Sequence, residues 1–409
     1  MKPKIVHILS SFPSKSETFI INVITESINQ GYASTILANN IVDIHNSSQP
    51  NLLKQYQLYQ NAQHITPTIP KNKAAKILKA LSLIIKQPKT LFYFIKSFDK
   101  KKYGAKSGTV KMLYQIYNFL QFPENTVYHG HFGINGIVLA QMKALGVIKG
   151  KIITSFYGYD TFATSEDQKK TQQEYKLLFN LVDDILVNSN YLKNNLLALN
   201  APESKIKMIH VGVDVNKFPF IKRNQSKVFK MITVGRLIHL KGQHLGVKVV
   251  SELKKRSYLI NYTIVGDGEE KENLQKQVET LNLQDEVQLV GAKNQEEIKQ
   301  YFNENNLFLM TSITDVDGRA EGQGLVTAEA QATGLPVVAF NSGGVGETIE
   351  NNSTGFLVTD KDVEAMVNKI EVLIKDPNLC QQMGIQARKL VEEKFNNKVQ
   401  TQKVIENYE

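Results

Sequence analysis

Short runs of β-branched and apolar residues alternate with amphipathic segments along most of the chain, which limits the folds it can adopt. A strand-like segment, KIVHILSS (4–11), precedes the helical spacing of TFIINVITESINQ (18–30), which Gly31 ends. A second strand-like segment, STILAN (34–39), follows at once. A strand, a helix and a second strand form a βαβ unit, which requires parallel strands with helices on the sheet faces. The expected fold class is therefore α/β.

The alternation runs through two series, which indicates two domains in the 409 residues. The first series ends with KIKMIHVG (205–212) and the second begins with KVFKMITVGRL (227–237). We expect two Rossmann-like, doubly wound domains facing an interdomain cleft, because ligands of such sheets bind at the carboxyl ends of the strands. The expected division is a first domain over 1–213, a linker over 214–228, a second domain over 229–392, and a C-terminal helix over 393–409 that packs back toward the first domain.

The composition excludes several classes of protein. Apolar residues make up 42% and charged residues 22%, which is typical of globular proteins and not of disordered ones. Cys380 is the single cysteine, so no internal disulfide can form, and we expect an inert thiol in a reducing compartment. The longest apolar stretch (80–95) is interrupted by Lys86, Pro88 and Lys89, and the N-terminal IVHIL run is too short for a signal peptide. The expected location is the cytoplasm, either free or peripheral at the inner face of the membrane.

The positive charge is concentrated in the first half. Residues 1–220 hold 26 lysines, no arginine and 13 acidic residues, which leaves the remainder at −3 of the total +10. Twelve of these lysines lie within 71–111, beside one acid, Asp99. Such a patch suits an anionic membrane surface or nucleic acid, and the apolar residues interleaved at 77–98 suit a helix in the membrane interface. Alternatively, these apolar residues pack onto the first sheet. Base-edge readout depends largely on arginine, so specific nucleic-acid recognition is not expected.

The strongest local motif is EGQGLVTAEAQATGLPVVAFNSGGVGETI (321–349). Glu321 and Glu329 stand eight residues apart, and Gly322 and Gly324 open a helix whose N-terminal amides can bind an anion. The two carboxylates can accept hydrogen bonds from the hydroxyl groups of a sugar and of a ribose. The helix amides can bind the phosphates that lie between that sugar and that ribose. The motif therefore favours a sugar-nucleotide site over an ordinary amphipathic helix.

A second motif, VGRLIHLKGQH (234–244), places two cations between a strand and a helix. Arg236 and Lys241 could neutralise a diphosphate leaving group, although an arginine and a lysine in a loop are often only surface charges. The segment VGDGEE (265–270) matches only part of a dinucleotide fingerprint, because Lys271 replaces its third glycine. We interpret it as a tight turn lining the site.

The order VGR, KG, VGDG, EGQGLVTAE and GLP resembles the retaining family 4 glycosyltransferases of GT-B fold. The pieces FPSKSETFI, HGHFG and SFYGYD are similar to its branch that makes exopolysaccharides of the colanic-acid type. The resemblance covers both domains and weakens over 45–115. It implies a retaining transferase that moves a sugar from a nucleotide diphosphate sugar to a glycan, lipid-linked acceptor, with no cofactor besides the donor substrate.

The resemblance also implies roles for residues. Arg236 and Lys241 would bind the donor diphosphate, Glu329 the ribose, and Glu321 the donor sugar, so that Glu321, Arg236 and Lys241 form the catalytic set. The acceptor-side residues would be Ser16, Glu17, His131, Tyr157 and Asp160, although many relatives carry a histidine in place of Tyr157 and His131 could be an ordinary core residue. The donor-binding set is Gly235, Gly266, Gly268, Gly322, Gln323, Gly324, Leu325 and Glu329.

Two patterns suggest metal sites, but neither is expected to bind one. Asp315-Val316-Asp317 matches the DxD pattern of a different glycosyltransferase fold, yet the diphosphate here already has two cationic partners, so a solvated loop is expected. His129-Gly130-His131 lacks a Cys or Glu at ligand spacing. The alternatives to a transferase are a GT-B-fold sugar-nucleotide epimerase, a glycogen-type synthase, and a lysine-rich nucleic-acid-binding protein.

Overall fold

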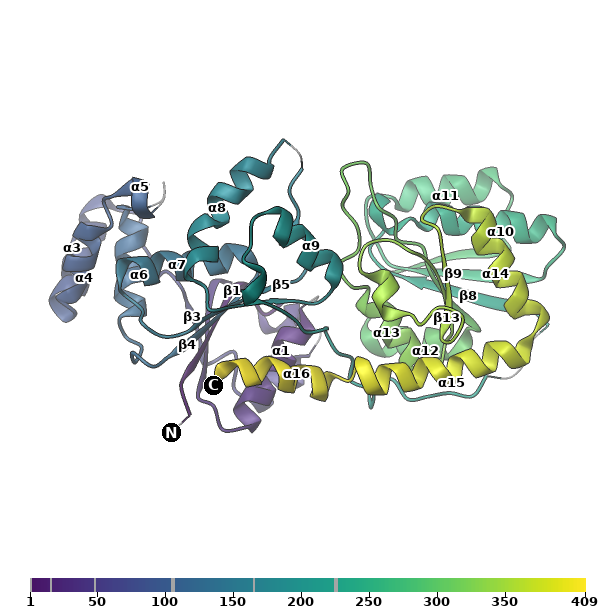
Figure 1. Cartoon of the computed structure of the whole chain (residues 1–409), viewed down its shortest axis with the longest axis horizontal. Helices are drawn as coiled ribbons and strands as arrows, with labels where there is room; N and C mark the ends of the chain where they lie inside the picture. Colours follow the sequence, from purple (N-terminus) through teal and green to yellow (C-terminus); the bar gives the residue numbers. More distant parts are fainter. Residues whose placement is uncertain (1, 15–16, 48, 104–106, 165, 224–226) are drawn as a thin grey trace. The chain divides into compact units, whose positions relative to one another are not determined.

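The computed structural model describes residues 2–14, 17–47, 49–103, 107–164, 166–223 and 227–409. The chain divides into two compact units (Figure 1). Unit 1 comprises Met1–Val187, Leu192–Ile209 and Thr401–Glu409, and unit 2 comprises Asn188–Tyr191 and His210–Gln400. The last nine residues therefore belong to unit 1, where the Tyr408 hydroxyl lies 2.8 Å from Nδ1 of His129.

Unit 1 contains a seven-stranded parallel sheet in the order β3-β2-β1-β4-β5-β6-β7. Its central strands β4, β5 and β6 are buried at every position, because helices cover both faces of the sheet. The strands are β1 (Ile5–Phe12), β2 (Ser34–Ile41), β3 (Ala62–His64), β4 (Val127–His131), β5 (Ile152–Phe156), β6 (Asp184–Val187) and β7 (Ile206–Met208).

The helices of unit 1 follow its strands as the alternation predicts, and the lysine-rich stretch adds several more. They are α1 (Thr18–Asn29), α2 (Pro50–Gln55), α3 (Lys73–Lys86), α4 (Lys89–Lys96), α5 (Lys100–Tyr103), α6 (Val110–Phe119), α7 (Gly133–Leu145) and α8 (Gln168–Leu181). Helices α9 (Asn190–Ala198) and α16 (Asn397–Ile405) contain residues of both units. Short 3-10 helices are η1 (Ile44–Asn46), η2 (Tyr159–Thr161), η3 (Glu203–Lys205) and η6 (Glu406–Tyr408).

Unit 2 contains a six-stranded parallel sheet in the order β10-β9-β8-β11-β12-β13. Its strands are β8 (Phe229–Val234), β9 (Ile260–Val265), β10 (Val287–Gly291), β11 (Leu307–Met310), β12 (Val337–Phe340) and β13 (Gly355–Val358). Its helices are η4 (His239–Lys241), α10 (Gln243–Lys255), α11 (Lys271–Thr280), α12 (Gln295–Glu304), α13 (Leu325–Ala332), η5 (Val345–Thr348), α14 (Val363–Lys375) and α15 (Pro377–Lys394). The expected α/β class with two doubly wound parallel sheets is confirmed.

The strand order reverses once in each sheet, between β1 and β4 in unit 1 and between β8 and β11 in unit 2. At such a point the loops after the two strands turn to opposite faces of the sheet and leave a crevice, which is where doubly wound sheets bind ligands. In the described part of the chain, no helix is long and apolar enough to cross a membrane.

Arg223 ties the segment before β8 to the body of unit 2. Its guanidinium donates to the ends of α12 and α13, where helix carbonyls have no partner within the helix and carry partial negative charge. The five acceptors are the carbonyls of Ile221, Phe302, Asn305 and Thr333 and the hydroxyl of Thr333, at 2.8–3.1 Å.

We expect Arg223→Lys to lower the free energy of unfolding of unit 2 by roughly 2 kcal/mol or more, because an ammonium can reach only some of these buried acceptors. Urea titration of the full chain measures the effect. The matched control is Lys222→Arg at the exposed neighbouring position, expected to stay within about 0.5 kcal/mol of wild type. Equal unfolding midpoints for the two variants would contradict this account.

Candidate active site

The loop after β8 is held by the loop after β9. The amide of Gly235 donates to the carbonyl of Val265 at 3.0 Å, and that of Leu237 donates to Asp267 at 2.9 Å. A side chain at Gly266 would lie 1.9 Å from the carbonyl oxygen of Gly235, and one at Gly268 2.3 Å from that of Leu237. These two glycines therefore let the loops approach closely, and their contact with a donor stays a prediction.

Lys241 is fixed at the switch point between β8 and β11. It ends η4, and its carbonyl accepts a hydrogen bond from the Thr311 hydroxyl at 2.8 Å. Gly242 follows in the left-handed conformation, with φ of 63°, and a Cβ there would lie 2.1 Å from the Thr311 carbonyl oxygen. The backbone of Lys241 is thus locked to the carboxyl end of β11.

Glu321 lies on a loop that rests on two glycines after β12. The amide of Gly344 donates to the carbonyl of Glu321 at 2.8 Å. A Cβ at Gly343 would lie 2.4 Å from that same carbonyl oxygen, and one at Gly344 2.0 Å from the carbonyl oxygen of Gly322. Sequence reasoning assigned no role to this glycine pair, although two adjacent glycines in the loop after a buried strand signal a close backbone approach.

Lys241 and Glu321 form an ion pair across these loops, with 18% and 19% of their side chains exposed. Burial alone would raise the pKa of the Glu321 carboxyl, but the Lys241 ammonium, the amide of Gly324 and the Arg236 charge together hold it below its usual range. Arg236 is exposed at the end of β8. The structure therefore brings together the three residues predicted as the catalytic set.

The helix α13 supplies an anion-binding end and a second carboxylate. Gly324 caps its N-terminus with φ of 81°. The amide of Thr327 donates to the Gly324 carbonyl at 2.9 Å, whereas those of Leu325 and Val326 precede the first intrahelical hydrogen bond and point out of the helix end. Glu329 lies one turn further on. Burial raises its pKa to about 7, and a contact from the Gln295 amide at 3.5 Å and the Lys217 charge only partly oppose this.

Gln323 differs from its neighbours in the motif, because its side chain is buried and used for structure. It exchanges two hydrogen bonds of 2.8 Å with the backbone of Val211. The predicted contact of Gln323 with the donor is therefore left to its backbone, and it stays a prediction.

The DxD pattern forms a compact loop. Asp315 accepts hydrogen bonds from the amides of Asp317 and Arg319 and from the Arg319 guanidinium at 2.6 Å. Its side chain is only 10% exposed, so the expectation of a solvated loop holds for Asp317 and is wrong for Asp315. The Asp315 carboxylate is occupied by its own loop.

Four of the five predicted acceptor-side residues lie together in unit 1, and Ser16 lies outside the described residues. Nδ1 of His131 lies 2.9 Å from the Tyr157 hydroxyl. Asp160 is buried and accepts from the amides of Gly133, Tyr157 and Gly158 at 2.9–3.2 Å, so it fixes this loop onto the start of α7. Burial raises the pKa of Asp160 and of Glu17 to about 6 each.

Sequence reasoning missed a third histidine beside His129 and His131. His7 on β1 pairs in register with His129 on β4, so all three side chains share one buried face. Their ligand atoms lie within 4.8 Å of one another. The rings of His129 and His131 are stacked at 4.1 Å, and the ring nitrogens of these two residues lie within hydrogen-bond distance of His7, Tyr157, Ser155 and Tyr408.

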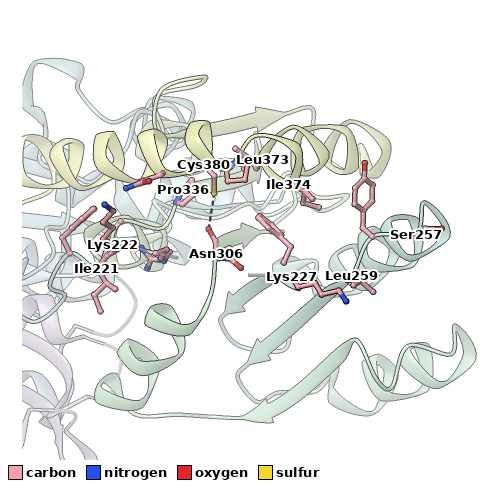
Figure 2. Close-up of a pocket in the computed structure, with 17 residues that line it drawn as sticks. Ile221, Lys222, Lys227, Ser257, Leu259, Asn306, Pro336, Leu373, Ile374 and Cys380 are labelled. Atoms are coloured by element: carbon pink, nitrogen blue, oxygen red, sulfur yellow. Dashed lines mark hydrogen bonds between the residues drawn. The ribbon is translucent and has the colours of Figure 1, made fainter. Parts of the chain in front are cut away.

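A cavity of about 370 Å³ lies at the other edge of the unit 2 sheet (Figure 2). It is lined by residues at the amino ends of strands, such as Leu259, Asn306 and Pro336, and therefore lies away from the loops that carry Lys241 and Glu321. The Cys380 thiol points to the Asn306 carbonyl there at 3.8 Å, and burial raises its pKa to about 11, which favours an unreactive thiol.

Comparison with known proteins gives the family. The family described as glycosyl transferases group 1 matches residues 214–390. Over 403 residues, 97% of each chain, the sequence is 31% identical to the amylovoran biosynthesis glycosyltransferase AmsK of Erwinia amylovora. The chain belongs to the group 1 glycosyl transferases. The expected glycosyltransferase activity is thereby confirmed.

Two further likenesses extend the comparison of this glycosyl transferase. It is 30% identical over 401 residues, 97% of each chain, to WcaL of Escherichia coli (strain K12), a putative colanic acid biosynthesis glycosyltransferase. The solved structure of Anabaena Alr3699/HepE in complex with UDP matches with a TM-score of 0.71, 18% identity and 99% of each chain covered. This second likeness shows the fold, in agreement with the expected GT-B class.

The raised pKa of Glu329 makes nucleotide binding depend on pH. If the Glu329 carboxylate accepts hydrogen bonds from the ribose hydroxyls, nucleotide binding favours the ionised form of Glu329. The affinity for UDP or GDP should then rise roughly fivefold from about pH 6 to about pH 8. Calorimetry measures this, with proton release on binding as a second readout. Glu329→Gln is the control, since it keeps an acceptor oxygen but cannot titrate, and its remaining pH dependence reports the phosphates of the nucleotide. Identical pH dependence in both proteins would exclude Glu329 from the ribose site.

Proposed function

We propose that this glycosyltransferase moves a sugar from a nucleotide diphosphate sugar to a glycan acceptor, with retention of the anomeric configuration, in exopolysaccharide or cell-surface polysaccharide synthesis. The observation that carries the proposal is the Lys241 and Glu321 ion pair beside Arg236 and the start of α13. The names of AmsK and WcaL support the polysaccharide role, and the UDP-glucose complex of HepE supports a sugar-nucleotide donor.

In this proposal the donor diphosphate replaces Glu321 as the partner of Lys241. Arg236, Lys241 and the first amides of α13 would stabilise the negative charge that grows on the leaving diphosphate. Glu321, released from the ammonium, would accept hydrogen bonds from hydroxyls of the donor sugar. Glu329 would accept hydrogen bonds from the ribose hydroxyls. No cofactor beyond the donor is proposed, because the two cations supply the charge that a divalent metal would bring.

Retention follows if the acceptor hydroxyl attacks the face that the diphosphate leaves. An oxygen of the departing phosphate then takes the proton of the acceptor hydroxyl, so the new C–O bond forms where the old one breaks. The protein's share of this step is to hold the two substrates and to stabilise the leaving group, in keeping with a site where Lys241 and Arg236 lie near Glu321 and the start of α13.

Removing either donor contact should lower kcat/KM by roughly 30- to 1000-fold, the equivalent of about 2 to 4 kcal/mol for a charge-assisted contact in the transition state. The variants are Lys241→Ala and Glu329→Ala, and the exposed Lys248→Ala on α10 is the control. Nucleotide diphosphate release is measured with a panel of UDP- and GDP-sugars and of mono- and oligosaccharide acceptors. If both variants stay within threefold of wild type, this is not the donor site.

The surface of α3 and α4 bears on where the glycan acceptor is held. Helices α3 and α4 and the turn after α4 expose large apolar side chains, which are 42–78% exposed: Ile77, Leu78, Leu81 and Ile85 in α3, Leu91, Phe92 and Ile95 in α4, and Phe98 in the turn. Within 73–98, Ala80, Leu83, Ile84 and Phe94 pack in a cluster with Leu113 and Tyr114 of α6. The alternative of full packing onto the protein is therefore wrong for most of these side chains.

We propose that this face of α3 and α4 binds an anionic membrane leaflet, which would make the protein peripheral at the inner face of the membrane and its acceptor lipid-linked. The two helices carry six lysines, at 73, 76, 79, 86, 89 and 96. Each lysine that reaches the surface contributes about 1 kcal/mol, and apolar side chains between them can enter the headgroup region. Nucleic acid would meet the same charge but would gain nothing from exposed Phe92, Ile95 and Ile85.

Wild-type protein should float with vesicles of anionic lipid at low salt and much less with neutral vesicles or at high salt. The double substitution of Phe92 and Ile95 by Ser should reduce flotation severalfold, because it removes two inserted side chains and no charge. Val316→Ser with Ile385→Ser is the control, since both are exposed apolar residues of unit 2. No flotation with anionic vesicles at low salt, or tighter binding of DNA than of vesicles, would overturn the membrane proposal.

A further inference from the structure

The three buried histidines of unit 1 form two hydrogen-bonded branches that end at Tyr157. In the first, Nδ1 of His7 lies 3.1 Å from Nε2 of His131, whose Nδ1 lies 2.9 Å from the Tyr157 hydroxyl. In the second, Nε2 of His129 lies 2.7 Å from the Ser155 hydroxyl, and Ser155 in turn donates to the Tyr157 hydroxyl, so this branch does not use the Tyr157 hydrogen.

All three imidazoles are neutral. Burial lowers the pKa of His7 to about 3 and holds the pKa values of His129 and His131 well below their usual range. A neutral imidazole carries one N–H and one lone pair, so each hydrogen bond of the first branch fixes the direction of the next. Only two orders are then possible for His7, His131 and Tyr157.

In one order, Tyr157 donates to His131 and His131 donates to His7. The hydrogen on Nε2 of His7 is then left without an acceptor, since this buried atom has no partner among the described residues. In the other order, His7 donates to His131 and His131 donates to Tyr157. That order leaves only a lone pair on Nε2 of His7, and buried groups lacking a donor are tolerated better than buried N–H groups lacking an acceptor.

We propose that His7 is a positioning residue for ligand recognition: through His131 it orients the Tyr157 hydroxyl so that its hydrogen is donated outward to an oxygen of the acceptor sugar. The identity of the ligand rests on the proposed function, whereas the orientation of the hydroxyl does not. Tyr157 follows the carboxyl end of β5, and its ring lies 4.6 Å from that of Phe19 and 5.1 Å from that of Phe132, so the ring itself is held.

The ligand oxygen is an acceptor, such as a sugar hydroxyl or ether oxygen. Burial raises the pKa of Tyr157 above its ordinary value, and the nearby carboxylates of Asp160 and Glu17 raise it further. Tyr157 is therefore a hydrogen-bond donor and not a base. This hydrogen bond would help to bind and align the acceptor sugar. The proton of the attacking sugar hydroxyl would still go to an oxygen of the departing diphosphate.

Two substitutions of His7 separate the relay from mere packing. The Nδ2 of an asparagine is three bonds from Cα, as is Nδ1 of histidine, so His7→Asn keeps a donor facing His131. The Nε2 of a glutamine is four bonds from Cα, as is Nε2 of histidine, so His7→Gln places its donor elsewhere. Both variants remain polar and uncharged, and thermal unfolding checks that each is folded.

Nitrogen-15 NMR of histidine-labelled full-length protein, without any sugar, decides the orientation, because the nitrogen shifts report which ring nitrogen is protonated. We expect His131 to carry its hydrogen on Nδ1 in wild type and in His7→Asn, and on Nε2 in His7→Gln. A wild-type His131 protonated on Nε2, the same tautomer in both variants, or a stoichiometric zinc ion in the purified protein would overturn the relay.

The recognition step is tested with the acceptor sugar identified by the transfer panel. Tyr157→Phe and His7→Gln should each raise the acceptor KM about three- to tenfold with the donor KM unchanged, and His7→Asn should restore it to within about twofold of wild type. An unchanged acceptor KM in Tyr157→Phe would overturn this step. A complete lack of transfer by wild type would instead refute the proposed function, while the tautomers would still decide the relay.

Discussion

The closeness of three backbone loops at the carboxyl edge of the unit 2 sheet is the constraint on which the predicted donor site depends. The loops after β8, β11 and β12 come within hydrogen-bond distance of one another, and no side chain fits at the points of contact. Gly242 lies against the end of β11, and Gly343 and Gly344 lie against the backbone at Glu321. Two oppositely charged side chains that are 80 positions apart in sequence can meet only because these backbones do.

The same arrangement explains why the pKa values of the two carboxylates diverge. Glu321 lies on the loop, where an ammonium and a helix amide offset the cost of its burial. Glu329 lies inside α13, where burial dominates. One motif therefore holds one carboxylate ionised and a second near its midpoint at neutral pH, and the ends of α12 and α13 that support it are tied together by Arg223.

The sequence was sufficient for the α/β class and for the closeness of Arg236, Lys241 and Glu321, because strand and helix periodicities are local and these residues lie in loops after strands. Their binding of the donor stays a prediction. The sequence was not sufficient where the outcome depends on what faces a residue from another strand. His7 stands in an ordinary strand pattern, and only its register with His129 makes it part of a network. Gln323 and Asp315 are similar cases, since backbone groups of other segments or of their own loop occupy their side chains. The sequence also could not show how many apolar residues of α3 and α4 are buried, because this depends on how much of the two helices α6 covers.

The ion pair of Lys241 and Glu321 also bears on selectivity. In the free protein the ammonium is already neutralised by a carboxylate of the same site, so a simple anion gains little by approaching it. A ligand that binds the Lys241 ammonium separates it from Glu321. Unless that ligand also donates hydrogen bonds to Glu321, the largely buried carboxylate is left unpaired. Inorganic phosphate and a bare diphosphate carry few P–OH groups that can donate a hydrogen bond, whereas a diphosphate joined to a sugar brings several sugar hydroxyls. In the proposed donor site the pair would thus act as an internal competitor that favours an intact sugar nucleotide over the simple phosphate anions of a cell.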